Sequence, residues 1–243
     1  MTRFFVSTDE LLCEAPILSG ENAAHAKVLR LKCGEQIVLC DGKGMECLCS
    51  VAEVQANAYV LQVIERRDAS AEAAVRVSVY MAYAKGDKLE HVIQKATELG
   101  AAEIVAFPSS RCVSRPDDKS IGKKLERWQK IAASAAEQSG RGVIPQVIAL
   151  NSFSAALERA AEADLPIMFY ENEQATTLRM ALVSRSWRSV SLLTGPEGGL
   201  DEREVETAKD AGLLVCTLGK RILRCETAPL CALSAVMYAA GEF

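Results

Sequence analysis

The chain has 243 residues, a formal net charge of −4 and a hydrophobic fraction of 49%, while aromatic residues account for only 5%. This composition predicts a folded protein with an aliphatic core, as in α/β proteins, and the length allows one large domain or a small domain followed by a medium one. No apolar run is long enough to span a membrane, and nine cysteines with only two histidines and no CxxC pair indicate free thiols in a reducing cytoplasm rather than disulfides or a zinc site.

The first seventy residues predict a small β-barrel, because short strand patterns are separated by glycine and asparagine and no helix-long periodicity is present. Four segments have the composition of strands: 3–6, 35–40, 46–51 and 59–64. Asp41-Gly42-Lys43-Gly44 is typical of a hairpin turn. One helix is expected to begin near Glu21 and to carry His25. Residues 65–72 are polar and aperiodic, so we interpret them as the linker between a domain at 1–70 and a second domain at 71–243.

From Val75 onward, strand and helix patterns alternate. Strands are expected at 75–83, 104–107, 147–150 and 167–170, and helices at 88–99, 123–139 and 152–163. Gly100 and Gly140 follow the first two helices, where glycine commonly ends a helix. Repeated β-α units predict an α/β fold with a mostly parallel sheet and helices on both faces.

Two loops near the end of the chain, 193–200 and 218–228, carry most of the functional signal. Each follows a buried strand pattern and precedes a helical pattern, and ligands of open α/β sheets bind at the carboxyl ends of the strands. Three glycines and a proline within residues 195–199 allow a sharp turn and a close approach of the backbone to a ligand. A purely structural interpretation is a strand-to-helix turn in which Asp201 caps the helix and Glu204 completes a capping box.

The order of these motifs resembles a known family. Gly195-Pro196-Glu197-Gly198-Gly199 is followed by Leu218-Gly219 and then by Ile222-Leu223-Arg224-Cys225-Glu226-Thr227-Ala228. This order resembles the SPOUT class of S-adenosylmethionine-dependent RNA methyltransferases, and most of all the bacterial family that methylates N3 of a uridine in 16S rRNA. Four further stretches fit the same family: Lys85-Gly86-Asp87-Lys88, Lys95-Ala96-Thr97-Glu98-Leu99-Gly100, Ser110-Arg111-Cys112 and Glu137-Gln138-Ser139-Gly140-Arg141. The second loop departs from the family at Cys225, where threonine is more common, which puts a role for a hydroxyl group there in question.

The resemblance implies a fold and partners. It implies that residues 1–70 form a PUA-like, RNA-binding barrel, with His25, Arg30 and Lys32 as candidate contacts, although His25 is equally compatible with a structural role. It implies that residues 71–243 form a SPOUT domain with a C-terminal trefoil knot, in which the chain around 219–226 passes through an earlier loop. It also implies a homodimer to which the helix expected at 229–240 contributes.

The resemblance further implies S-adenosylmethionine as the cofactor, held by the two loops without a metal. The expected cofactor-binding residues are Leu193, Thr194, Gly195, Pro196, Glu197, Gly198, Gly199, Leu218, Gly219, Ile222, Leu223, Arg224, Thr227 and Ala228. Since the sulfonium methyl group is already electrophilic, the protein mainly aligns donor and nucleophile. Loss of the uridine N3 proton requires a base or a cation. We expect Arg224 to be that cation, and Glu197 or Glu226 either to act as the base or to hold a loop through backbone amides.

Positive charge is concentrated in the middle of the chain despite the net negative charge. Residues 111–141 hold eight basic and four acidic side chains, whereas residues 1–70 hold seven basic and ten acidic ones. The basic stretch predicts contact with an RNA backbone, although a solvated helix face would have a similar composition. Beyond the barrel, the expected RNA-binding residues are Lys85, Arg111, Gln138 and Arg141.

Other enzyme classes fit less well. The first strand is followed by Ala84-Lys85-Gly86-Asp87 rather than G-x-G-x-x-G, and neither a P-loop nor a G-x-S-x-G elbow is present. We therefore expect methyl transfer to a uridine N3 of 16S rRNA in the assembled 30S subunit. Two alternatives stay open: a SPOUT enzyme acting on a ribose 2′-hydroxyl or on tRNA, and a non-catalytic ribosome assembly factor, against which the intact loop glycines argue.

Overall fold

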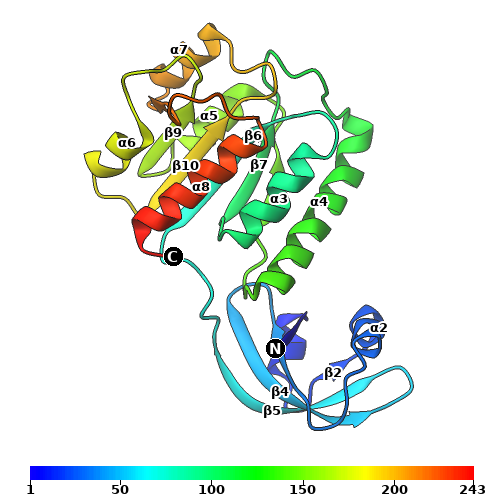
Figure 1. The fold of residues 1–243 in the computed structure, drawn as a ribbon. Helices are drawn as coiled ribbons and strands as arrows, with labels where there is room; N and C mark the ends of the chain where they lie inside the picture. Colours follow the sequence, from blue (N-terminus) through cyan, green and yellow to red (C-terminus); the bar gives the residue numbers. More distant parts are fainter. The chain divides into compact units, whose positions relative to one another are not determined.

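The computed structural model describes residues 1–243, with the exception of the Asp118 side chain, and divides the chain into two compact units (Figure 1). Unit 1 comprises Met1–Glu72 and Ala136–Ile144, and unit 2 comprises Ala73–Ala135 and Pro145–Phe243. The sequence did not lead us to expect the return of residues 136–144 to the first unit. No described helix is both long enough and apolar enough to cross a membrane.

Unit 1 is built on a five-stranded mixed sheet in the strand order β1-β3-β4-β5-β2. Its elements are β1 (Thr2–Phe5), α1 (Thr8–Leu12), β2 (Ile17–Leu18), α2 (Gly20–Val28), β3 (Gln36–Cys40), β4 (Met45–Val54) and β5 (Tyr59–Asp68). Only the β1–β3 pair is parallel among these neighbours. Alternate residues of β4 (Cys47, Cys49 and Val51) are buried, as the two-residue period of a strand requires. The strand order leaves β1 and β2 as edge strands, so an open sheet is found where the sequence predicted a small barrel.

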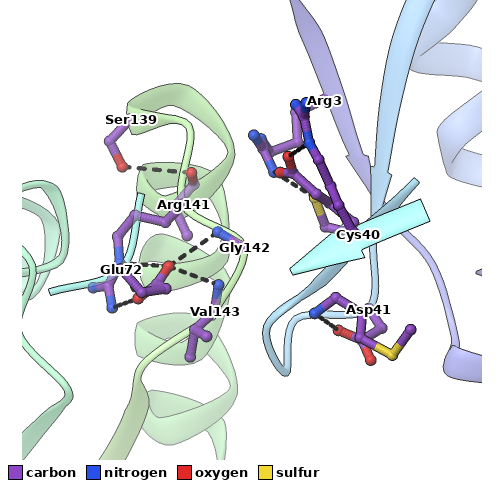
Figure 2. Close-up of polar contacts among 12 residues, drawn as sticks. Arg3, Cys40, Asp41, Glu72, Ser139, Arg141, Gly142 and Val143 are labelled. Atoms are coloured by element: carbon purple, nitrogen blue, oxygen red, sulfur yellow. Dashed lines mark hydrogen bonds and ion pairs between the residues drawn. The ribbon is translucent and has the colours of Figure 1, made fainter. Parts of the chain in front are cut away.

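A carboxylate fastens the segment 136–144 within unit 1, as Figure 2 shows. Glu72 accepts hydrogen bonds from Nη2 of Arg141 at 2.7 Å and from the backbone amides of Gly142 and Val143 at 3.0 Å each. Arg141 is only 4% exposed. A Cβ at Gly142 would overlap the Ala69 methyl group, so the close approach of the two segments requires glycine.

Unit 2 contains a six-stranded, fully parallel sheet in the order β11-β9-β10-β6-β7-β8. Its strands are β6 (Arg76–Ala82), β7 (Glu103–Phe107), β8 (Gln146–Ala149), β9 (Leu165–Phe169), β10 (Ser189–Thr194) and β11 (Leu214–Cys216). Its helices are α3 (Lys88–Glu98), α4 (Asp118–Ser139), whose last turn belongs to unit 1, α5 (Phe153–Ala160), α6 (Leu178–Ser184), α7 (Glu202–Asp210) and α8 (Thr227–Ala240).

Helices cover both faces of this sheet. Tyr80 and Ala82 of β6 share a core cluster with residues of α5 and α7, while the alternate residues Val79 and Met81 are also fully buried and face the opposite side. Figure 1 shows α3 and α8 side by side, and α8 contacts both β10 and β6. The predicted α/β class and parallel sheet are therefore confirmed. Helices α1 and α6 and the two-residue strand β2 were not predicted.

Candidate functional site

A pocket of about 580 Å³ lies at the carboxyl ends of β9, β10 and β11, within unit 2. Both glycine-rich loops line it, together with residues that follow β9 and one residue at the start of α3. The lining residues are Lys88, Phe169, Tyr170, Glu171, Thr194, Gly195, Pro196, Glu197, Gly198, Gly199, Thr217, Leu218, Gly219, Lys220, Arg221, Ile222, Leu223, Arg224, Cys225, Glu226 and Ala228. The fold thus brings together most of the residues that the sequence singled out.

Two predicted residues lie elsewhere. Leu193 is fully buried in the core cluster that includes side chains of α5 and α7, so its side chain faces away from the pocket. The prediction that Leu193 contacts the ligand is therefore wrong for its side chain. Thr227 begins α8 and is not among the residues that line the pocket.

The first loop is both a glycine turn and a capped helix start. Gly199 donates its backbone amide to Pro196 O at 3.0 Å and has a φ of 69°, a conformation that favours glycine. A Cβ at Gly195 would lie 2.9 Å from Cγ of Leu200, closer than packing allows. Asp201 then caps α7, and Glu204 completes the capping box. The ligand-binding interpretation of residues 193–200 and the structural interpretation as a capped strand-to-helix turn are therefore compatible.

Lys88 lies between the acidic residues of the two loops. Its Nζ donates to Oε1 of Glu197 at 2.9 Å and lies 3.9 Å from Oε2 of Glu226. The backbone amide of Lys85 donates to the same Glu197 oxygen at 2.9 Å. Partial burial raises the pKa of Glu197, but the hydrogen bonds from Lys88 and Lys85 outweigh that effect and hold the pKa below its usual value. Glu197 is thus an ionised brace between α3 and the first loop.

The second acidic candidate, Glu226, is also kept ionised. Its own backbone amide lowers its pKa first, and the Cys225 thiol, which donates to Oε2 at 3.2 Å, lowers it further against the effect of burial. Burial raises the pKa of the Cys225 thiol to about 12. Cys225 is therefore a neutral hydrogen-bond donor at the position where the resemblance led us to expect threonine more often.

Arg111 braces the outer side of the first loop. Its Nη1 donates to Gly198 O at 3.2 Å, and its Nη2 lies 3.3 Å from Oδ2 of Asp201. A Cβ at Gly198 would approach Cβ of Arg111 to 3.2 Å, so a larger side chain there would push the two segments apart. The Arg111 side chain is 45% exposed, which leaves it accessible for a further contact.

Three cations of the second loop line the pocket and are exposed: Lys220, Arg221 and Arg224. Within the described part of the chain, none of the three makes a side-chain hydrogen bond or an ion pair. Ile222, between them, is 85% exposed. Of these three cations, only Arg224 was predicted from the sequence, although Lys220 and Arg221 are also basic residues of the same loop.

The remaining predicted RNA contacts belong to different units. Arg30 and Lys32 are exposed after α2 in unit 1, Gln138 is exposed at the end of α4, and Lys85 is exposed in unit 2. Nδ1 of His25 lies 3.3 Å from Oε1 of Glu137, and the His25 ring packs edge-on against Phe4 with a centroid distance of 5.5 Å. These contacts favour the structural role that was allowed for His25.

Arg141 requires a correction. The sequence placed it among the RNA contacts because it ends a basic stretch. Its side chain is instead buried and paired with Glu72, so its guanidinium is not available to a phosphate group. No group of three His, Cys, Asp or Glu side chains among the described residues is arranged to hold a metal ion.

Comparisons with known proteins match both units. Residues 71–237 match a family model described as an RNA methyltransferase domain, and residues 18–64 match one described as an RNA methyltransferase PUA domain. The chain is 41% identical over 247 residues to ribosomal RNA small subunit methyltransferase E of Bacillus subtilis, covering 98% of this chain and 96% of that protein. It is 33% identical to the protein of the same name from Mycobacterium tuberculosis, with coverages of 96% and 90%.

Solved structures give the same result. A ribosomal RNA small subunit methyltransferase E from Neisseria gonorrhoeae bound to S-adenosylmethionine superimposes with a TM-score of 0.84 at 30% identity, covering 98% of this chain and 97% of that one. A putative methyltransferase from Legionella pneumophila in complex with the same cofactor gives a TM-score of 0.83 at 28% identity and 98% coverage of both chains.

Proposed function

Because this chain belongs to the family of ribosomal RNA small subunit methyltransferase E, and is therefore an S-adenosylmethionine-dependent rRNA methyltransferase, we propose that it methylates N3 of one uridine in 16S rRNA. The observation that carries this proposal is the pocket formed by the two glycine-rich loops, which the exposed cations Lys220, Arg221 and Arg224 also line. The substrate form we propose is the assembled 30S subunit, which places the enzyme in the cytoplasm.

The residues of the pocket fit S-adenosylmethionine. A volume of about 580 Å³ lies within the usual range for small-molecule sites. The backbones of residues 194–199 and 217–226 supply amides and carbonyls, and Leu218, Ile222 and Leu223 supply an apolar wall suited to an adenine ring. When bound, the cofactor supplies an electrophilic methyl group.

We infer that the site promotes loss of the N3 proton by stabilising the resulting anion with a positive charge, and not by supplying a strong base. Glu197 and Glu226 have lowered pKa values, and a carboxylate with a low pKa is a weak acceptor for a proton that leaves only well above neutral pH. Arg224 lines the same pocket and its side chain makes no hydrogen bond or ion pair with the described residues, so its positive charge can stabilise the N3 anion as the proton passes to water. We therefore keep Arg224 as the catalytic cation and assign Glu197 and Glu226 to loop bracing.

Three finer features complete the proposal. Residues 1–70 act as a PUA-like RNA-binding domain and residues 71–243 as the SPOUT domain, with residues 219–226 threaded in a trefoil knot. Helix α8 leaves Tyr238 74% exposed and Cys231 exposed, which supports a homodimer through this helix. Arg30, Lys32, Lys85, Arg111 and Gln138 remain the proposed RNA contacts of the sequence analysis.

The test is incubation of unmethylated 30S subunits with the enzyme and labelled S-adenosylmethionine, followed by mass spectrometry of the nucleosides of 16S rRNA. We expect N3-methyluridine, and much less of it with Arg224→Ala even at saturating S-adenosylmethionine. A 2′-O-methyl product, or transfer to tRNA alone, would replace the proposal with the corresponding SPOUT activity. Cofactor binding without transfer to any RNA would indicate an assembly factor.

A further inference from the structure

Glu171 is an acidic residue of the pocket that was not predicted from the sequence and has no role in the mechanism proposed for the N3 proton. It is the second residue after β9, the strand that pairs with both β10 and β11. Since those two strands lead into the two glycine-rich loops, the end of β9 lies between the loops, and Tyr170 and Glu171 both line the pocket. The backbone amide of Tyr170 donates to Cys216 O at 3.1 Å, which ties this segment to β11.

The carboxylate of Glu171 lies directly against Gly199 of the first loop. A Cβ at Gly199 would overlap Oε1 of Glu171 and would lie 3.2 Å from its Oε2. The absence of a side chain at residue 199 therefore has a specific effect, because it leaves room for this carboxylate at the wall of the pocket.

Glu171 has no partner among the described residues, whereas its neighbour Glu173 has two. Oε1 of Glu173 accepts from the backbone amides of Ala175 and Thr176 at 2.7 and 3.0 Å, and these bonds lower its pKa. No described residue donates a hydrogen bond to Glu171 or forms an ion pair with it. Glu173 holds the turn after β9, so Glu171 is free to accept hydrogen bonds from a ligand.

A carboxylate accepts hydrogen bonds, so the group that Glu171 binds must be a hydrogen-bond donor of S-adenosylmethionine. The ribose presents two hydroxyl groups on adjacent carbons, which match the two oxygens of one carboxylate, and acidic residues bind ribose hydroxyls in the same way in dinucleotide sites. The ribose also lies in the middle of the cofactor, between the adenine and the sulfonium, as Glu171 lies between the two loops. The α-ammonium group, the other strong donor, lies at the far end of the molecule.

We infer that Glu171, beside Gly199 of the first loop, binds the ribose hydroxyls of S-adenosylmethionine. This inference rests on the proposed function, because it takes S-adenosylmethionine as the occupant of the pocket.

The test is calorimetry with Glu171→Gln, which keeps the size of the side chain and removes its charge. The ligands are S-adenosylhomocysteine and 5′-methylthioadenosine. The second ligand has the same ribose but lacks the amino acid part and its ammonium group. We expect Glu171→Gln to lose roughly tenfold in affinity for both ligands, since a hydrogen bond to a charged group is lost in each. The matched control is Glu202→Gln at the start of α7, outside the pocket, which should bind both ligands as the unaltered chain does.

The outcomes separate the alternatives. A loss for S-adenosylhomocysteine alone would overturn the ribose assignment in favour of the ammonium group. Unchanged affinity for both ligands would show that Glu171 is a solvated surface residue and would also overturn it. Failure of the unaltered chain to bind S-adenosylhomocysteine would overturn the proposed function itself. Equal thermal unfolding midpoints of the two variants would confirm that folding is unaffected.

Discussion

At the scale of single residues, Lys88 connects the parts of the site. It is the first residue of α3, and its ammonium group reaches Glu197 of the first loop and approaches Glu226 of the second. Both loops must keep their conformations for their backbone groups to face one ligand. The ion pair therefore acts through loop position rather than through contact with the reacting atoms.

We predict that Lys88→Ala weakens binding of S-adenosylhomocysteine roughly five- to tenfold, because two carboxylates then repel each other across the pocket. The matched control is Lys85→Ala, which keeps the backbone amide that donates to Glu197 and loses only an exposed side chain. Calorimetry without RNA measures both variants. Equal affinity of Lys88→Ala and Lys85→Ala would contradict the bracing role of Lys88.

The ion pair between Lys88 and Glu197 predicts that the stability of the fold depends on pH. The folded-state pKa of Glu197 is lowered, so its contribution to stability is complete above the usual glutamate pKa and is lost as the pH falls through the lowered value. We expect the stability difference between the unaltered chain and Lys88→Ala to be constant near neutral pH and to shrink below about pH 4.5, the reference value for glutamate. Urea unfolding at a series of pH values measures this. A difference that grows on acidification would contradict it.

The residues of the site differ in how far the sequence could reveal them. Gly195, Gly198 and Gly199 were predicted because they form one continuous turn motif in the sequence. Lys88 and Glu197 are separated by 109 positions, and no local pattern reports such a contact. Glu171 was missed even though it follows a predicted strand, because an isolated glutamate after a strand is usually a solvated residue.

At the scale of secondary structure, the beginning of α7 supports the first loop. Glu204 accepts a hydrogen bond from the backbone amide of Asp201 at 2.9 Å, and its other oxygen accepts from the amide of Ser110 at 2.6 Å. One side chain therefore completes the helix cap and holds the loop that carries Arg111. The cap could be predicted because its residues are adjacent in sequence, whereas the Ser110 contact spans 94 positions and could not.

We predict that Glu204→Ala lowers the free energy of unfolding by about 1 kcal/mol, the typical contribution of a helix cap. Glu206→Ala is the control: it removes a carboxylate from the same helix that forms an exposed ion pair with Lys209, and should change stability by no more than ~0.5 kcal/mol. Urea denaturation compares the two variants. Identical midpoints would show that the cap does not contribute to folding.

At the scale of the whole molecule, the chain passes between the two units three times, at residues 72–73, 135–136 and 144–145. Glu72 is the last residue of unit 1 before the first passage, and it binds Arg141, Gly142 and Val143 of the returning segment. The sequence could not predict this, because the basic stretch from 111 to 141 has one composition and its last arginine becomes buried only through the return of the chain. The composition predicted the net charge of residues 111–141 but not which of their side chains are exposed to solvent.

We therefore predict that Arg141→Ala acts on stability rather than on RNA binding. Removing the arginine leaves the partly buried Glu72 carboxylate without its cation, which should lower the free energy of unfolding by roughly 2–4 kcal/mol. The contrasting variant is Lys220→Ala, whose exposed side chain lines the pocket. It should leave stability within ~0.5 kcal/mol and reduce the slope of log affinity against log salt for rRNA by about one. If Arg141→Ala instead reduced that slope at unchanged stability, Arg141 would have to be returned to the RNA-binding residues, and Glu72 would not be the group that keeps residues 136–144 in unit 1.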